Sequence, residues 1–547
     1  MLSPRILAVL VALGATVVLP FALRPKEDLL AKADETLVVI TPHNEAIRSE
    51  FARTFAEHYR ARHGRTVRID WRTPGGTSEI AKYLASEYLA AFRLHWTRDL
   101  SRPWSPEVEE GFQNPRIRPD DSPADDRPAE AARRLFLASA TGCGIDLFFG
   151  GGSYDFNVQA EAGRLVDSGA IGRHPDLFGT GPAAIPAILG GEPFWDAQGR
   201  WVGTCLSAFG ICYNTDALAR LGIPTPPRQW ADLGSPRYLG ELAVADPTKS
   251  GSIAKAFELL IQQQMHEAWE SLAALPPEER EHRAVREGWT RGLRLIQRIA
   301  ANARYFTDAA SKIPLDVALG DAAAGMSIDF YGRTQSEAVR RPDGTSRIQY
   351  LTPEGGSSVG VDPIGLLRGA PNPDAARAFI DFVLSPEGQK LWNFRPDTPG
   401  GPSRFALRRL PIRKELYAPE YRPFLSDPDV RPYEQGAQFD YRAAWTAPLF
   451  RTISFIVRVM CLDPHDELRA AWSGIVAAGL PPDALARFEN LDGVGYDQAS
   501  GPIRDALRSG DKLAEVRMAR ELGEAFRSRY REAGRLARAS EPSPATR

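Results

Sequence analysis

The stretch "TLVVITPHNEAIRSEFARTFAEHYRARHGRTVRIDWR", residues 36–72, decides the fold class of this chain of 547 residues. Residues 36–40 form a short apolar run, which is typical of a buried strand. From Ile47 to Tyr59, apolar side chains recur at four-residue steps and predict an amphipathic helix. Gly64 is placed to end that helix, and the alternating residues 66–72 predict a second strand. The stretch therefore predicts a strand, a helix and a strand in succession.

The same alternation continues along the chain. A second helix follows the turn at 72–79, and further strand, turn and helix units occupy residues 145–155 and 242–261. Alternating strands and helices imply a parallel sheet with helical crossovers, so we expect an α/β fold. Residues 90–126 are crowded with Arg, Asp, Pro and Trp and predict a long surface insertion. Residues 431–547 read as an amphipathic helical region.

The N-terminus carries the pattern of a targeting segment. Arg5 precedes an apolar run from Ile6 to Leu23, and Arg24 and Lys26 follow it. This pattern predicts that residues 1–24 are an export signal or an uncleaved membrane anchor, and both alternatives stay open. Residues 25–35 are then a charged linker.

Composition excludes several classes of function. The chain has 67 Lys and Arg against 69 Asp and Glu, a net charge of −2, without a basic block. Nucleic acid is therefore not an expected partner. The four Cys residues show no CxxC spacing, which argues against structural zinc and leaves disulfides or buried thiols open. No HExxH motif occurs and no catalytic set of residues emerges, so we expect a protein that is not an enzyme and has no resident cofactor.

Four loops connect predicted strands to predicted helices: 40–45, 72–79, 149–155 and 245–252. Ligands of open α/β sheets bind outside the carboxyl ends of the strands, where helix N-termini offer unpaired N–H groups to anions. Each loop taken alone could equally be only a turn. Together they predict a cleft, with Lys249 as a cation for a bound anion. The predicted loop ligands are Thr41, His43, Asn44, Gly76, Thr77, Ser78, Gly151, Ser153, Lys249, Ser250, Gly251 and Ser252.

Several segments resemble a known family. "DPTKSGS" (246–252) and "FIDFVLSPEGQKLW" (379–392) are similar to the extracellular solute-binding proteins of ferric-ion type. The resemblance covers roughly residues 36–475 apart from the insertion. It implies a two-lobed, type II periplasmic-binding-protein-like fold with a helical C-terminal extension. It also implies a monomeric periplasmic receptor that captures a small-molecule or ion ligand for the permease subunits of an ABC transporter in the inner membrane.

The resemblance further implies how the lobes are built. Residues 36–205 and 356–395 would form the first lobe, and residues 206–355 and 396–430 the second. The C-terminal region, 431–547, would pack on the second lobe.

The resemblance leaves the ligand open. Ferric-binding members hold iron with a His, a Glu and a Tyr pair, for which His43, Glu79 and Tyr331 are the candidates here. The Tyr pair is incomplete because the chain reads Asp329-Phe330-Tyr331, so Asp329 and Tyr331 are added as candidate ligand residues. Losing one phenolate weakens an iron site, so a small anionic or organic solute is the preferred ligand and ferric ion the alternative. A membrane-anchored sensor or regulatory subunit on the same fold is the second functional hypothesis.

Overall fold

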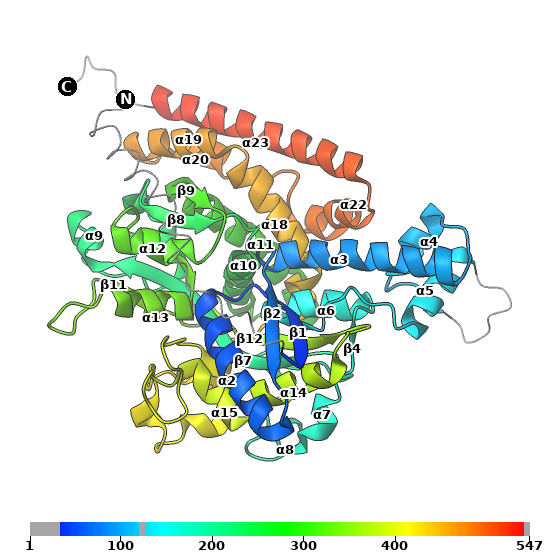
Figure 1. Ribbon diagram of the computed structural model, residues 1–547. Coiled ribbons are helices and arrows are strands. Elements are labelled where there is room, and N and C mark those ends of the chain that lie inside the picture. The colour runs from blue at the N-terminus through cyan, green and yellow to red at the C-terminus, as the bar shows by residue number, and fades with distance from the viewer. Residues whose placement is uncertain (1–32, 120–126, 541–547) are drawn as a thin grey trace, which may run out of the picture.

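The computed structural model describes residues 33–119 and 127–540. The predicted signal or anchor, 1–24, and all but the end of the predicted linker lie outside the described residues. Two lobes and a layer of C-terminal helices make up the described chain (Figure 1). The expected α/β class with a helical C-terminal extension is confirmed.

The first lobe is built around the sheet that begins with the opening stretch. β1 (Glu35–Ile40) pairs in parallel with β2 (Val67–Arg72) and with β3 (Leu147–Phe149). β12 (Val359–Leu367) returns from far along the chain and pairs antiparallel with β3. α2 (Glu45–His63) covers this sheet and ends at Gly64, whose φ of 68° is left-handed. The other elements of this lobe include α3 (Thr77–Leu94), α5 (Pro128–Ala138), α6 (Ser153–Glu161), β4 (Leu165–Val166), α7 (Ala170–Arg173), α8 (Pro175–Phe178), β5 (Ile188–Leu189), β6 (Glu192–Pro193), α14 (Pro373–Leu384) and α15 (Pro386–Asn393).

One long strand joins the two lobes. β7 (Val202–Asn214) pairs with β12 through Ala208 and with β10 (Ala324–Ile328) from Phe209 onward. Its first half therefore belongs to the sheet of lobe 1 and its second half to the sheet of lobe 2. Because the ladder is continuous, the lobes meet along extended backbone.

The second lobe has its own sheet and its own core. β10 pairs in parallel with β8 (Leu242–Ala245), β8 pairs in parallel with β9 (Ala303–Thr307), and β11 (Ile348–Leu351) pairs with β7. Its buried side chains form a cluster separate from that of lobe 1. Its helices include α9 (Thr215–Arg220), α10 (Gly251–Ser271), α11 (Pro277–Asn302), α12 (Lys312–Leu319) and α13 (Asp329–Ala338).

The C-terminal helices share the core of lobe 2. Tyr530, fully buried, donates its hydroxyl to the carbonyl of Met460 at 2.8 Å and accepts from Gln297 at 2.9 Å. Residues Ala443–Leu462 are long and apolar enough to cross a membrane, but 72% of an 18-residue apolar window within them is buried inside the protein, as in a core helix. Figure 1 shows this layer above lobe 2; its main helices are α18 (Phe450–Val457), α19 (His465–Ala477), α20 (Pro482–Phe488), α22 (Arg504–Arg508) and α23 (Lys512–Ala539).

The predicted lobe boundaries need two corrections. The change of lobe in β7 falls between Ala208 and Phe209 rather than after residue 205. Residues 396–430 were expected in lobe 2, but β13 (Leu410–Pro411) pairs with the lobe 1 half of β7. Leu407, Leu410 and Ile412 are buried in the first core, because their apolar side chains cover the free edge of that sheet.

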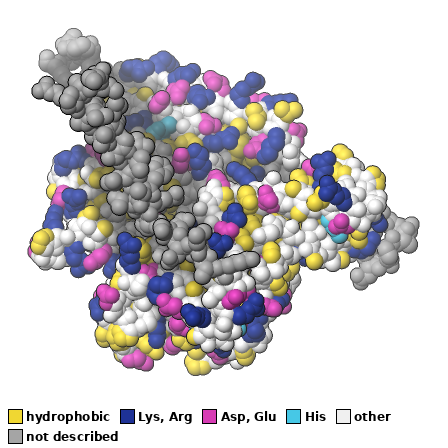
Figure 2. All heavy atoms as spheres, in the orientation of Figure 1, with side chains coloured by type: hydrophobic (Ala, Val, Ile, Leu, Met, Phe, Trp, Pro, Cys, Tyr) yellow, Lys and Arg dark blue, Asp and Glu magenta, His cyan; other side chains and the backbone are white. Residues whose placement is uncertain are grey.

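The predicted insertion, 90–126, is partly an ordered arm. Residues 90–94 complete α3, which runs out to α4 (Pro106–Gly111), away from the sheet (Figure 1). Phe92 and Phe112 stack with ring centroids 4.8 Å apart, and Phe136 packs against both. This small aromatic core explains why the polar sequence still holds a defined shape. On the face shown in Figure 2, Lys and Arg side chains are interspersed with Asp and Glu.

Candidate ligand-binding site

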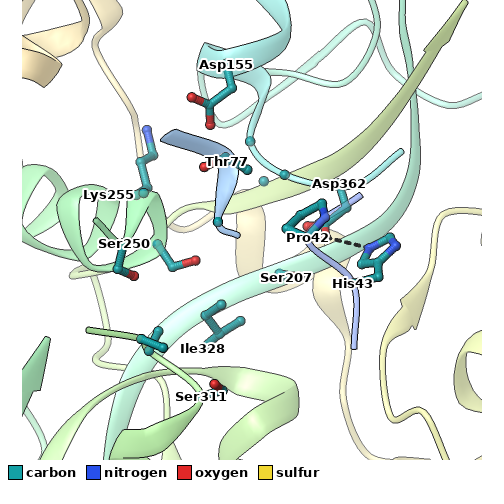
Figure 3. A pocket seen from close by; sticks show the side chains of 18 of the residues that line it. Pro42, His43, Thr77, Asp155, Ser207, Ser250, Lys255, Ser311, Ile328 and Asp362 are labelled. Atoms are coloured by element: carbon teal, nitrogen blue, oxygen red, sulfur yellow. Dashed lines mark hydrogen bonds and ion pairs between the residues drawn. The ribbon is translucent and has the colours of Figure 1, made fainter. Parts of the chain in front are cut away.

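A cavity of about 530 Å³ lies between the lobes, beside the crossing strands β7 and β12. Loops of both lobes line it, as do the N-termini of α2, α3, α6 and α10. Figure 3 shows Thr77, Asp155, Ser250 and Lys255 on one side of it and His43 with Asp362 on the other. The carboxyl ends of the strands open onto this space, as the loop pattern predicted.

The structure gathers most of the predicted ligand residues around this one cavity. Those that line it are His43, Asn44, Gly76, Thr77, Glu79, Gly151, Ser153, Lys249, Ser250, Gly251, Ser252 and Tyr331. Thr41, Ser78 and Asp329 do not line it. Residues from loops more than 200 positions apart thus share one space.

Two of the predicted ligand residues that do not line the cavity have structural roles. The fully buried Thr41 accepts a hydrogen bond from the backbone N–H of His43 at 3.1 Å and so shapes the turn into α2. The strand β10 ends at Ile328, and Asp329 is the first residue of α13. Its buried carboxylate accepts from Arg333 one turn later at 2.8 Å. The carboxylate of Asp329 is thus paired within its own helix and lies outside the cavity lining.

Two helices reach the cavity with uncapped first turns. The N-cap residues of α3 and α6 are Gly76 and Gly152, and neither helix has a side-chain cap. In contrast, the hydroxyl of Ser250 caps α10 by accepting from Ile253 N–H. First-turn N–H groups without a cap are available to a bound acceptor, and the helix dipoles favour negative charge there.

The two lobes touch each other above the cavity. A Cβ at Gly76 would lie 3.1 Å from the carbonyl oxygen of Lys249 in the other lobe. A Cβ at Gly251 would lie 2.8 Å from Oγ1 of Thr77. Glycine at both places permits this close approach of backbone, so the described conformation is a closed one.

A buried charge cluster forms the floor. Asp362 accepts from Arg409 and lies 3.4 Å from Nε2 of His43, and Arg409 also donates to Ser207 at 3.2 Å. Burial would raise the pKa of Asp362, but Arg409 and His43 hold it below its ordinary value. Burial lowers the pKa of His43, so its imidazole is neutral at pH 7. The ring lies edge-on to Phe149 with centroids 4.6 Å apart, and Trp392 lies on it as well. His43 therefore acts here as a packed core group.

Asp155 is a carboxyl group at the cavity whose pKa is raised. Burial raises its pKa to about 6, against hydrogen bonds from the Thr77 hydroxyl and the Gly152 N–H that lower it. The group stands at the third position of α6, where it reaches back to the start of its own helix. Its charge therefore changes between pH 5 and pH 7 inside the cavity.

Lys255, on the second turn of α10, is a cavity residue that sequence reasoning missed. Its ammonium lies 2.8 Å from Glu192 of lobe 1 and 2.9 Å from Glu258 of α10. Although burial lowers the pKa of a lysine, the two carboxylates raise that of Lys255 well above its ordinary value. The available signal was the pair of opposite charges, Lys255 and Glu258, one turn apart near the start of a largely apolar helix.

Lys249, the predicted cation for an anionic ligand, is exposed by half and lies 2.7 Å from Asp308, which is 79% exposed. Its pKa is raised by that hydrogen bond. The residue is at the rim of the cavity, with a carboxylate of its own lobe as its partner. Arg409 and Asp362, which form the floor, were also missed. The signals were the lone Asp362 within the apolar stretch 359–367 and the adjacent pair Arg408 and Arg409 within the stretch 405–412.

The predicted metal ligands do not gather into a metal site. Within residues 33–119 and 127–540, His, Cys, Asp and Glu form no group of three that could hold a metal ion. Burial raises the pKa of Tyr331, which disfavours the phenolate that ferric ion prefers. The four Cys are all free thiols, and Cys205, Cys212 and Cys461 are buried.

Comparison with curated proteins finds distant relatives. An uncharacterized protein of Haemophilus influenzae is 28% identical over 250 residues, which cover 45% of this chain and 60% of that protein. The phosphoglycerate transport regulatory protein PgtC of Salmonella typhimurium is 27% identical over 190 residues, or 35% of this chain and 40% of that protein. The chain thus matches less than two thirds of the length of either relative.

A solved substrate-binding protein of an ABC transporter from Agrobacterium tumefaciens superimposes with a TM-score of 0.46 at 15% identity. The superposition covers 77% of this chain and 94% of that chain. Residues 163–416 match the sequence profile described as bacterial extracellular solute-binding protein. That segment includes β7, β12, Lys255 and Arg409, which build the centre of the cavity. Residues 163–416, just under half of this chain, are therefore similar in sequence to the bacterial extracellular solute-binding proteins.

Proposed function

We propose that the protein is the periplasmic solute-binding component of an ABC importer and that it captures a small organic solute between its lobes. The observation that carries the proposal is the closed cavity of about 530 Å³, which both lobes line. This volume is typical of small-molecule sites and far exceeds that of a bare ion. The protein would act as a monomer and pass its solute to permease subunits in the inner membrane.

The walls favour a solute with one apolar side and one acceptor-rich group. Phe209, Ile328, Val361 and Phe450 supply apolar surface. The uncapped N-termini of α3 and α6 supply N–H donors, which suit a phosphate or carboxylate. Because a distant relative carries the name of a phosphoglycerate transport regulatory protein, phosphorylated organic acids are the first class to test.

The test is a competition among three probes. The purified protein is dialysed against 3-phosphoglycerate, glycerate and ferric citrate, and the retained compounds are measured by mass spectrometry. We expect an organic solute to be retained and the radius of gyration in X-ray scattering to fall when it binds, since capture closes the lobes. Tight retention without any compaction would contradict the two-lobed mechanism.

Ferric ion is the alternative ligand, and its signature is optical. A tyrosinate bound to iron gives a visible absorption band. We expect none in protein incubated with ferric citrate, because Tyr331 offers at most one phenol, and the pKa of that phenol is raised by burial. A band that disappears in Tyr331→Phe would establish the iron site instead.

A membrane-tethered regulatory subunit is the second candidate function. The C-terminal helical layer and the regulatory name of the Salmonella relative favour it. Sequencing the N-terminus of the mature protein from soluble and membrane fractions separates the two. An intact apolar segment in the membrane fraction favours the regulator, and a processed soluble form favours the importer component.

A further inference from the structure

The C-terminal region reaches into the ligand cavity. Phe450, the first residue of α18, lines the cavity, and its ring centroid lies 4.5 Å from that of Tyr154. Tyr154 belongs to α6 of lobe 1, whereas α18 packs in the core of lobe 2. One wall of the cavity is therefore an aromatic contact between the C-terminal region and lobe 1.

The segment that leads to Phe450 starts on lobe 1. We call residues 432–450 the strap; it contains α16 (Pro432–Gly436) and α17 (Ala443–Thr446). The Tyr433 hydroxyl donates to the carbonyl of Ile412, and the Tyr441 N–H donates to the carbonyl of Gly190 at 2.8 Å. A Cβ at Gly191 would lie 1.8 Å from the carbonyl oxygen of Tyr441, so this backbone contact admits only glycine.

The other end of the strap is fixed to α10 by buried polar groups. Glu258 accepts from the hydroxyls of Tyr441 and Thr446, both at 2.7 Å. The Gln262 side chain accepts from Arg442 N–H at 2.9 Å and donates to Thr446 at 2.7 Å. Buried groups of this kind are costly to leave without partners, so the strap cannot leave α10 without a large loss of stability.

The same contacts tie the strap to the wall of the cavity. The ammonium of Lys255 lies 3.7 Å from the ring centroid of Tyr441 while it binds Glu192 and Glu258. Glu192 also accepts from Ser358, next to the start of β12, at 2.7 Å. The strap thus crosses between the lobes beside β7 and β12 and shares its anchor with Lys255.

We propose that the strap is a specificity element of the ligand cavity, with Phe450 as the residue that limits the size of the solute. The strap also forms a third connection between the lobes, in addition to the strands β7 and β12. Closure of the lobes on a solute is therefore transmitted to the C-terminal helices. The inference rests on the proposed function for the identity of the cavity, but the third connection can be tested without a solute.

The first experiment compares two truncations within α18. Phe450→Ala removes the wall, and Phe455→Ala removes a buried ring of the same helix that does not line the cavity. The probe is whichever of 3-phosphoglycerate and glycerate the parent retains more strongly, titrated by calorimetry. We expect Phe450→Ala to weaken binding by tenfold or more and Phe455→Ala by less than twofold. Equal affinities in both variants would overturn the assignment of Phe450.

The second experiment needs no solute and compares two glycine substitutions. Gly191→Ala places a methyl group against Tyr441, whereas Gly222→Ala meets no atom within 4 Å, and both glycines have a positive φ. We expect Gly191→Ala to speed amide exchange at Tyr441 and along α19 and to raise the radius of gyration. Gly222→Ala should change none of these.

Two results would overturn the third connection. In the first, amide exchange at Tyr441 is faster, but the radius of gyration and the exchange in α19 stay the same. In the second, amide exchange at Tyr441 itself does not change. If Gly191→Ala does not fold, Tyr441→Phe removes only the hydroxyl bond to Glu258 and is scored by the same readouts. Failure of every probe to bind would contradict the proposed function, while a response to Gly191→Ala would still support the connection.

Discussion

Two lysines six residues apart show how strongly environment decides the role of a residue. Lys249 is half exposed at the rim of the cavity, with the exposed Asp308 as its partner. Lys255 is 18% exposed and is held by two nearly buried carboxylates and a tyrosine ring. A pair of exposed charges contributes little to stability, whereas buried carboxylates that lose their cation are costly.

Replacement of each lysine by methionine tests this contrast. Lys255→Met leaves Glu192 and Glu258 buried without a counter-charge, so we expect the free energy of unfolding to fall by about 3–5 kcal/mol. Lys249→Met should leave it close to that of the parent. Urea unfolding followed by circular dichroism measures both, and equal stabilities in the two variants would contradict the cluster.

Asp155 predicts a pH dependence with a definite sign. Its pKa is about 6 in the folded protein against an ordinary value of 3.8, so the folded state holds the proton more tightly. The contribution of this group to stability is therefore full below pH 4 and is lost as the pH rises through 6. Asp155→Asn removes the ionisation. We expect its stability relative to the parent to rise by about 1–3 kcal/mol between pH 4.5 and 7.5, as measured by urea unfolding.

At the scale of the element, the loops before α3 and α10 act as the two edges of the closed cavity. A Cβ at Gly251 would lie 2.8 Å from Oγ1 of Thr77, across the boundary between the lobes. Gly251→Ala should therefore hold the lobes apart and raise the radius of gyration, without unfolding either core. Adding Thr77→Ala removes the obstructing atom and should restore the compact form. The radius of gyration of the single and double variants, measured by X-ray scattering, tests this contact. A compact Gly251→Ala variant would show that the two loops do not meet.

Local pattern was enough to predict most elements. The strand 242–245 matches β8, and the four-residue apolar steps with Gly64 predict α2 correctly, because both signals lie within one element. The residues that complete the cavity could not be predicted in this way. Asp362 and Arg409 meet only because β12 and the β13 segment return to lobe 1, and Phe450 arrives from a region expected to pack elsewhere. Contacts between distant parts of the chain leave no periodic trace in the sequence.

At the scale of the whole molecule, the C-terminal layer is part of the core of lobe 2. Phe526, Tyr530, Ala533 and Ala537 of α23 are buried together with residues of α11 and α19. The layer is therefore structural in addition to any role in signalling.

Deletion of residues 512–547 should expose this core. Loss of two large aromatic side chains alone costs about 3–5 kcal/mol each, so we expect a large fall in the thermal midpoint. Tyr530→Phe, which keeps the ring and loses the hydroxyl shared with Gln297 and Met460, should cost about 1–3 kcal/mol. Scanning calorimetry measures both, and an unchanged midpoint after the deletion would show that α23 is dispensable.

The return of β12 and β13 to lobe 1 has a consequence for the newborn chain. β3 lies between β1, made early, and β12, and the first core is closed by Leu410 and Ile412. When the ribosome has made only about the first 350 residues, the sheet of lobe 1 still lacks β12, and β3 is an unpaired edge strand. A chain stalled at that stage would expose the unpaired backbone N–H and C=O groups of this strand edge to chaperones. The order of synthesis thus delays completion of the first core until the segment around Leu410 and Ile412 has been made.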